Sequence, residues 1–147
     1  MPLKEYWKKR KFSETPEPKG KVGKGSGNIF VVHEHHASHL HWDFRLELDG
    51  VLKSWAIPKK PPKTRNVKRL AIMTEDHPME YAGFEGTIPE GLYGAGTVKI
   101  WDKGTFDLIE KTDNKIKVKL SGKELDGEYE LTRFKKIGKD KWLFFKV

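Results

Sequence analysis

One stretch of the sequence gathers most of the side chains that could bind a metal ion. Five of the chain's six histidines lie between residues 33 and 41, and from residue 40 to residue 48 (LHWDFRLEL) apolar and polar residues alternate strictly. A period of two is typical of a β-strand, so His41, Asp43 and Arg45 should form one row, with neighbours about 6.6 Å apart. Such a row could present two metal ligands and then a cation to one small anion.

The candidate metal ligands are His35, His41 and Asp43. Two imidazoles and one carboxylate can hold a divalent cation on one side and leave positions open for substrate and water. We expect His35 to lie in a loop that folds back toward the strand face. Because the chain has no cysteine, the ligand set suits Mn²⁺, Fe²⁺ or Zn²⁺, and the spacing does not choose among them. The alternative is a polar barrel face with solvated histidines, but the clustering, the alternation and the neighbouring Arg45 favour a metal site.

Several other residues could bind a phosphate beside that metal. Arg45 shares the strand face, Lys59 follows the next predicted strand, and Arg69 opens the one after it. Arginine binds phosphate through paired N–H groups and lysine acts as a point charge, as a phosphoryl-transfer site requires, although Lys59 or Arg69 alone would more often be a surface charge. His77, in a long loop with Tyr81, could donate to a phosphate or leaving oxygen, or could pack in a structural turn.

The elements that must position these groups indicate an all-β fold. Asp49-Gly50 is a favoured two-residue hairpin turn, which joins the strand at 40–48 to a partner at 51–57. Further strands are predicted at 28–32, 69–74, 97–101, 105–110, 115–120, 127–134 and 141–146, with turns that include 102–104 and 121–122. So many short strands predict a β-barrel of about eight mostly antiparallel strands with short flanking helical segments.

The chain is expected to form a single domain over residues 1–147. Residues 1–27 form a basic, partly extended N-terminal segment, with a short helix near 3–10 and a Gly-rich loop at 20–27 (GKVGKGSG). Residues 75–96 have no regular period and read as a long loop. Its last part, 91–96, resembles a phosphate-cradling turn, but no amphipathic helix follows, so tight turns into a strand are expected instead.

Composition narrows the class of protein further. The net charge is +8, from 29 Lys and Arg against 21 Asp and Glu, which favours a polyanionic partner such as nucleic acid. The absence of cysteine excludes a disulfide framework, a thiolate zinc site and a cysteine nucleophile. No apolar run approaches the roughly 18 residues of a membrane span and no signal peptide is apparent, so a cytoplasmic location away from membranes is expected.

Two long segments, FVVHEHHASHLHWDFRLELDGVLKSWAIPK and KRLAIMTEDHPMEYAGFEGTIPEGLYGAGTVKIWDKG, resemble the 3′-phosphoesterase domain of bacterial DNA ligase D and its stand-alone relatives. The likeness extends from the opening LKEYWKKRKFSETPEP to the last strand. It implies a β-barrel with an active-site crescent on one side. It also implies a Mn²⁺-dependent enzyme, for which Zn²⁺ or Co²⁺ could substitute, that removes a 3′-terminal ribonucleoside and then the remaining 3′-phosphate to leave a 3′-OH.

The same resemblance implies a role for particular positions. The metal ligands fall on His35, His41 and Asp43, the phosphate-contacting groups on Arg45, Lys59, Arg69 and His77, a further required tyrosine on Tyr81, and auxiliary positions on Arg10, Glu17 and His33. Two residues depart from the family pattern. Lys11 replaces a usual aspartate and His33 a common glutamine, which bears on the relative rates of the diesterase and monoesterase steps.

Two other functions stay open from the residues alone. A non-haem iron oxygenase could use the same ligand set, and activity with Mn²⁺ under anaerobic conditions would separate it from a phosphoesterase. A non-catalytic nucleic-acid-binding barrel would bind in a salt-sensitive way and form no product. The leading hypothesis is a monomeric phosphoesterase that acts on primer-template 3′ ends, alone or beside a separate DNA ligase.

Overall fold

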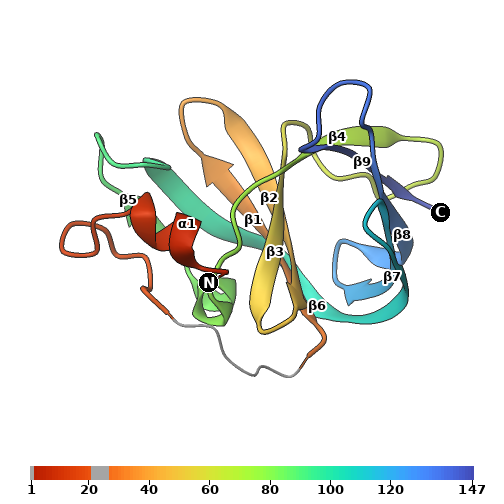
Figure 1. Cartoon of the computed structure of the whole chain (residues 1–147), viewed down its shortest axis with the longest axis horizontal. Coiled ribbons are helices and arrows are strands. Elements are labelled where there is room, and N and C mark those ends of the chain that lie inside the picture. Colours follow the sequence, from red (N-terminus) through yellow and green to blue (C-terminus); the bar gives the residue numbers. More distant parts are fainter. Residues whose placement is uncertain (1, 21–26) are drawn as a thin grey trace.

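A computed structural model describes residues 2–20 and 27–147, in which nine strands and two short helical segments form (Figure 1). In chain order the elements are α1 (Lys4–Lys8), β1 (Ile29–His36), β2 (Leu40–Leu48), β3 (Val51–Ile57), β4 (Lys68–Met73), the 3₁₀ helix η1 (Met79–Gly83), β5 (Gly86–Ile88), β6 (Gly96–Lys111), β7 (Lys115–Gly122), β8 (Asp126–Arg133) and β9 (Lys141–Lys146).

Eight of these strands close into an antiparallel β-barrel, as predicted. The strand order is β1-β2-β3-β4-β9-β8-β7-β6, and β6 pairs back onto β1. The short strand β5 adds to β6 as a ninth member. Closure removes the exposed edges that an open sheet of this length would present to other chains.

The β2–β3 hairpin confirms its predicted bounds and turn. Asp49 and Gly50 have φ of 56° and 78°, so both occupy the left-handed region that a tight two-residue turn requires. The turn fixes the register, which places Arg45 opposite Ser54 and Asp43 opposite Ala56. The hairpin therefore sets which side chains meet on the outer face of the barrel.

The predicted turns at 102–104 and 121–122 are wrong, because β6 runs unbroken from Gly96 to Lys111 and β7 continues to Gly122. Gly104 and Gly122 are cross-strand partners in this long pairing. A Cβ on Gly104 would lie 2.2 Å from the Ser121 carbonyl oxygen, so glycine is needed here for a close backbone approach. The turns were predicted because glycine beside polar residues is typical of turns, but here the glycines lie within strands.

Asp102 is buried and serves the β7–β8 turn. Its carboxylate accepts hydrogen bonds from the backbone N–H groups of Lys103 and Lys123, each at 2.9 Å, and from that of Leu125 at 2.8 Å. A buried carboxylate with this many donors replaces the backbone pairing that a turn cannot make for itself.

Asp102→Ala is therefore expected to destabilise the fold. Removing the carboxylate leaves the buried N–H of Leu125 and two partly buried N–H groups without their acceptor, at a cost of about 2–4 kcal/mol in the free energy of unfolding. Urea denaturation followed by circular dichroism measures this change. Asp107→Ala, at an exposed position of the same strand, is the matched control and should stay within about 0.5 kcal/mol of the parent chain. Equal stability of the two variants would contradict the assigned role.

Buried apolar side chains of residues 2–20 and 27–147 form two clusters. The barrel interior is filled by aromatic and aliphatic side chains that include Phe44, Trp55, Trp142 and Phe144. A smaller cluster lies outside the barrel wall, beneath α1 and η1, and is made of Tyr6, Leu52, Tyr81, Phe84, Ile88 and Val98. The predicted N-terminal helix is thus confirmed as α1 (Figure 1), whose Tyr6 ring packs edge to face on the Tyr81 ring of η1.

Two sequence predictions are qualified by the extent of the structure. Within the predicted Gly-rich loop, residues 21–26 lie outside the described residues. The long segment 75–96 contains η1 and β5 in place of an unbroken loop, and residues 91–95 turn into β6 as expected. Across the described residues, no helix has the length and apolar character needed to cross a membrane.

Candidate active site

A cavity of about 310 Å³ lies on the outer face of β1–β3, where the N-terminal segment and the segment after β4 meet. Among the residues that line it are Arg10, Glu17, His35, His41, Asp43, Arg45, Glu75, His77 and Tyr81. The alternation predicted for β2 places these groups here, because Trp42, Phe44 and Leu46 point into the barrel core while His41, Asp43 and Arg45 face the cavity.

His35 reaches the cavity from a strand, and the expectation of a loop at this position is wrong. The strand β1 continues to His36 because it pairs with β2 on one side and with β6 on the other. In this register His35 lies directly opposite His41, and His33 lies opposite Asp43. Cross-strand neighbours have Cβ atoms about 5 Å apart, which brings the three candidate ligands together.

The three ligand side chains converge at one point. Each offers a donor atom, and these atoms lie within 4.8 Å of one another. Asp43 Oδ2 is 3.3 Å from His41 Nε2 and 3.6 Å from His35 Nδ1. Across the described part of the chain, no other group of three or more His, Cys, Asp or Glu side chains converges in this way.

The outer nitrogens of both imidazoles are held by backbone carbonyls. His35 Nε2 lies 2.7 Å from the Gly94 carbonyl oxygen and His41 Nδ1 lies 3.1 Å from that of His39. In the neutral rings these outer nitrogens donate, which leaves the inner nitrogens with lone pairs for a cation; an inner nitrogen that donates to Asp43 belongs to a protonated ring. This second contact, from imidazole N–H to a carbonyl, is the usual support of a metal-ligating histidine. The donor set therefore fits a divalent cation.

The charges of the ligands point the same way. Burial alone would raise the pKa of Asp43, but the positive charge of Arg45 and the hydrogen bonds from both histidines hold it well below its ordinary value. Burial would lower the pKa of His41, but the hydrogen bond and the negative charge of Asp43 outweigh it and raise the pKa. The carboxylate is thus ionised, and it attracts either a proton or a metal ion to the space between the rings.

Arg45 is buried beside this group with its guanidinium held on three sides. Its Nε donates to His33 Nδ1 at 3.1 Å, and its Nη1 donates to Ser54 Oγ at 2.9 Å. Its Nη2 lies 3.5 Å from Asp43 Oδ2, and its Cζ lies 4.8 Å from the centre of the Tyr81 ring. The guanidinium is therefore oriented before any anion arrives.

The contacts of His33 define its tautomer. Because Nδ1 accepts from Arg45, the proton is on Nε2, which donates to the Phe84 carbonyl oxygen at 3.1 Å. Burial, followed by the positive charge of Arg45, lowers the pKa of His33 to about 3. His33 is accordingly neutral and offers one acceptor and one donor, as a glutamine amide would.

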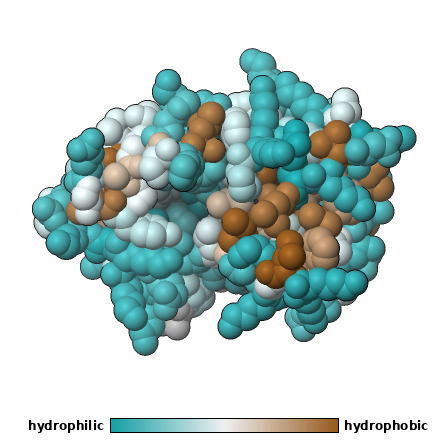
Figure 2. Space-filling model, turned by 90° about the horizontal axis from the view of Figure 1, so that it is seen from above, coloured by the Kyte–Doolittle hydropathy of each residue, from teal (hydrophilic) through white to brown (hydrophobic). Residues whose placement is uncertain are grey.

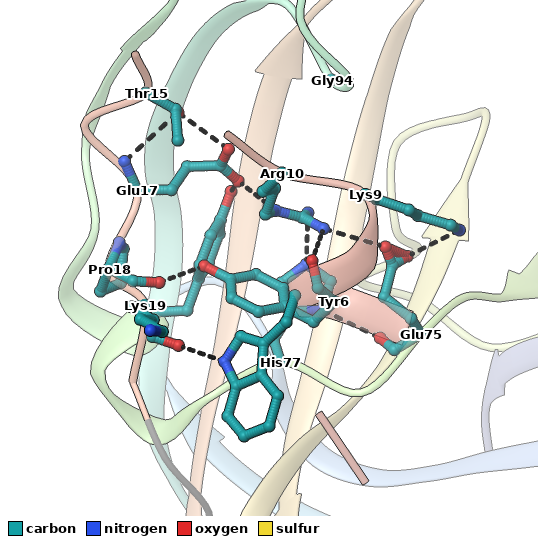
Figure 3. A network of polar contacts seen from close by, with 12 residues as sticks. Tyr6, Lys9, Arg10, Thr15, Glu17, Pro18, Lys19, Glu75, His77 and Gly94 are labelled. Atoms are coloured by element: carbon teal, nitrogen blue, oxygen red, sulfur yellow. Dashed lines mark hydrogen bonds and ion pairs between the residues drawn. The ribbon is translucent and has the colours of Figure 1, made fainter. Parts of the chain in front are cut away.

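The N-terminal segment supplies one wall of the cavity through a chain of buried polar contacts (Figure 3). Arg10 Nε lies 2.9 Å from Glu17 Oε2, and Arg10 Nη1 lies 3.3 Å from Glu75 Oε2. Glu17 also accepts hydrogen bonds from Tyr81 Oη at 2.8 Å and from Thr15 Oγ1 at 2.9 Å. These contacts tie residues 10–17 to the segment that carries His77.

His77 lies next to the Arg10 guanidinium, and Ser54 Oγ, which accepts from Arg45, lies 3.4 Å from His77 Nδ1. Its Nδ1 is 2.9 Å from the Glu75 carbonyl oxygen, so it donates there and leaves Nε2 as the acceptor. Arg10 Nη2 approaches Nε2 to 3.4 Å. Burial, together with the charges of Arg45 and Arg10, holds the pKa of His77 well below its ordinary value. In this state His77 is neutral, with a lone pair beside the cations.

Lys59 and Arg69 are not brought into this cavity. They line a separate pocket of about 210 Å³, together with Pro58, Lys68 and Leu70. Lys59 is exposed, and Arg69 Nε donates to the Lys60 carbonyl oxygen at 2.9 Å. The two cations therefore lie together at a second pocket, separate from the cavity of the metal ligands.

Other residues near the site were either set aside or missed by sequence reasoning. His36, His39 and Lys11 are exposed. Ser54 and Glu75 were not predicted, although the fully buried Ser54 supports Arg45 and Glu75 supports Arg10. The signal for Ser54 was present, because it is the polar residue between Leu52 and Ala56 on the outward face of β3.

Comparison with known proteins adds a family to this geometry. Residues 33–133 match the family described as the DNA ligase D 3′-phosphoesterase domain. The chain is 50% identical over 147 residues to the multifunctional non-homologous end joining DNA repair protein LigD of Mycobacterium tuberculosis, which covers 96% of this chain and 19% of that protein. It is 47% identical over 155 residues to the multifunctional non-homologous end joining protein LigD of Pseudomonas aeruginosa, which covers 99% of this chain and 18% of that protein. The chain thus spans about a fifth of the length of these curated relatives.

Proposed function

Because the chain belongs to the family of DNA ligase D 3′-phosphoesterase domains, we propose that it is a metal-dependent phosphoesterase that heals the 3′ ends of DNA or RNA-tailed DNA. Water attacks the 3′ phosphorus twice: the first hydrolysis releases the 3′-terminal ribonucleoside and leaves a 3′-phosphate, and the second releases inorganic phosphate and leaves a 3′-OH for repair synthesis or ligation in non-homologous end joining. The observation that carries this proposal is the oriented guanidinium of Arg45 beside three convergent metal ligands.

The metal would be held by His35, His41 and Asp43. We propose Mn²⁺ as the cofactor, with Zn²⁺ or Co²⁺ as substitutes, since imidazole and carboxylate suit all three ions. When bound, a divalent cation draws electron density from a phosphoryl oxygen and offsets its negative charge.

The side chains around the metal site act on the phosphate directly. Arg45 binds a phosphoryl oxygen, and its orientation by His33 and Ser54 means that little reorganisation is needed in the transition state. A phosphate bound next to His77 adds the negative charge that favours the imidazolium form. Its Nε2–H then donates to a phosphoryl oxygen or to the leaving oxygen. Tyr81 keeps the Arg45 guanidinium in place through its ring and holds Glu17 through its hydroxyl.

Lys59 and Arg69 take a different part in the proposal. Because they line a separate pocket, we assign them to a neighbouring backbone phosphate of the strand whose end is being processed. The net charge of +8 supports a nucleic-acid substrate. We propose that the chain works as a monomer in the cytoplasm, alone or beside a separate DNA ligase.

The decisive experiment uses a primer-template whose primer ends in a 3′-ribonucleotide or a 3′-phosphate. The chain is incubated with Mn²⁺, Mg²⁺, Zn²⁺ or EDTA, and the products are separated on a denaturing gel. We expect 3′-OH products with Mn²⁺, also under anaerobic conditions, and none with EDTA. No end-processing with any metal would refute the proposed function.

His33 offers a test of how Arg45 is positioned. His33→Gln keeps one acceptor for Arg45 Nε and one donor for the Phe84 carbonyl. The rates of ribonucleoside removal and of 3′-phosphate removal should therefore both stay within about threefold of those of the parent chain. His33→Leu removes both partners and should lower kcat by about 10- to 100-fold, with little change in KM, because supporting contacts of a catalytic group have effects of this size. Steady-state kinetics on 3′-phosphorylated primer-template measure the difference. Parent-like kcat in a folded His33→Leu variant would argue against this role.

A further inference from the structure

The outer face of β4 and β9 carries an apolar patch, defined here as Leu70, Ile72, Leu143 and Phe145. Their strand neighbours Ala71, Trp142 and Phe144 point into the barrel core, whereas the four patch residues are partly exposed and, among the described residues, belong to neither core cluster. Leu70 and Leu143 are register partners, so the two strands present one continuous surface. Figure 2, seen from above the view of Figure 1, shows apolar side chains gathered on this upper side among hydrophilic ones.

Cations line the β4 side of this patch. On its β8 side Glu130 is the register partner of Phe145, and its carboxylate lies 3.6 Å from Lys115. Residues 58–73, which lead into and include β4, hold six Lys and Arg and no carboxylate. Lys68 is exposed, and its Nζ lies 5.1 Å from the centre of the Phe145 ring. The nearby carboxylate of Asp140 already contacts Lys141 at 3.0 Å. The β4 side of the rim is therefore complementary in charge to a polyanion.

The patch adjoins both the cavity of the metal ligands and the pocket lined by Lys59 and Arg69. Leu70 lines the pocket that also contains Lys59 and Arg69. Ile72 is the register partner of Ala56, which lines the cavity of the metal ligands. A strand whose 3′ end enters that cavity would thus meet the patch with the nucleotides that precede its end.

We infer that the β4–β9 face binds unpaired nucleotides adjacent to the 3′ end, an inference that rests on the proposed function. Single-stranded nucleic acid offers both bases, which pack on apolar and aromatic side chains, and phosphates, which bind cations. A duplex offers phosphates but keeps its bases stacked inside, so it would leave the apolar centre without a partner. The combination of an apolar centre with a basic rim therefore selects the unpaired strand.

The test is fluorescence anisotropy in EDTA with two 3′-phosphorylated DNAs, a blunt duplex and a duplex with a 3′ single-stranded tail. We expect the tailed DNA to bind about tenfold more tightly, because each base stacked on a side chain adds roughly 5-fold or more. Lys68→Gln and Phe145→Ala should each remove about 3- to 10-fold of that affinity, and Lys68→Gln should reduce the salt slope by about one. Phe145→Ala should leave binding of the blunt duplex unchanged.

Lys119→Gln, at an exposed position of β7, is the matched control and should bind both DNAs like the parent chain. Equal affinity for the two DNAs, or unchanged tail binding in both variants, would overturn the inference. Salt-independent self-association that Lys68→Gln or Phe145→Ala abolishes would also overturn the inference, because the face would then join two copies of the chain. Because Lys68 is exposed, Lys68→Gln should stay folded. It therefore tests tail binding even if Phe145→Ala lowers the melting temperature. Binding in EDTA does not depend on catalysis. If the chain binds the tailed DNA as expected but processes no 3′ end with any metal, the proposed function is refuted and the inferred binding face is not.

Discussion

Replacing His41 by alanine is expected to abolish removal of both the 3′-ribonucleoside and the 3′-phosphate, with rates lowered about 10³-fold or more. The variant loses one of three convergent ligands, and the charge stabilisation that a bound cation provides amounts to several kcal/mol, where each 1.4 kcal/mol is a factor of ten. Asp43→Ala should have the same effect. Because the His41 side chain is 24% exposed, its removal leaves the barrel core intact.

Two measurements separate loss of metal from loss of structure. Isothermal titration with Mn²⁺ should show binding to the parent chain and weakened or absent binding to His41→Ala, while circular dichroism stays unchanged. His39→Ala is the matched control, because His39 belongs to the same histidine cluster but its side chain is exposed and is not among the convergent ligands. Its activity should equal that of the parent chain. Full 3′-phosphatase activity in His41→Ala would remove the metal assignment.

Local sequence patterns predicted the part of the site that one hairpin builds. Strict alternation assigned His41, Asp43 and Arg45 to one face of β2, and Asp49-Gly50 identified the turn that sets their partners on β3. Both features depend on neighbours within a few residues, so they are visible without knowledge of the rest of the chain.

Features that depend on distant pairing were not predicted. The strand β1 extends through His35 because β6, more than 60 residues later in the chain, pairs along its whole length. The same β6 absorbs Asp102 and Gly104, which composition assigned to a turn. Strand continuity of this kind is decided by the partner strands and not by the propensity of the residues themselves.

Distance along the chain also misled the grouping of the phosphate-binding residues. Lys59 and Arg69 belong to the segments that follow the β2–β3 hairpin, which carries Arg45, but they line a different pocket. Conversely, Tyr81 and Glu17 are separated by 64 residues yet share a hydrogen bond of 2.8 Å. Only the folding of residues 2–20 over η1 brings these two side chains together, and no periodicity in the sequence encodes that packing.

The second large effect is expected at Arg45, where lysine should not replace arginine. Arg45→Lys keeps the positive charge but loses the planar group that donates to His33 at 3.1 Å and to Ser54 at 2.9 Å while a third nitrogen faces Asp43. The remaining ammonium is one flexible point charge, so the donor is no longer aligned with the phosphoryl oxygen in the transition state. We expect kcat on 3′-phosphorylated primer-template to fall about 10²- to 10³-fold.

The control for this substitution is Arg133→Lys. Arg133 also has its guanidinium over an aromatic ring, with Cζ 4.7 Å from the centre of Trp142, and it also donates to two partners, the carbonyls of Asp113 and Lys139. It does not line the metal-ligand cavity, so its variant should keep parent kcat even if the melting temperature falls. A charge requirement alone would leave Arg45→Lys as active as Arg133→Lys. If the oriented planar guanidinium is required, kcat should fall strongly in Arg45→Lys and stay unchanged in Arg133→Lys. Titration with Mn²⁺ should show that Arg45→Lys still binds the metal.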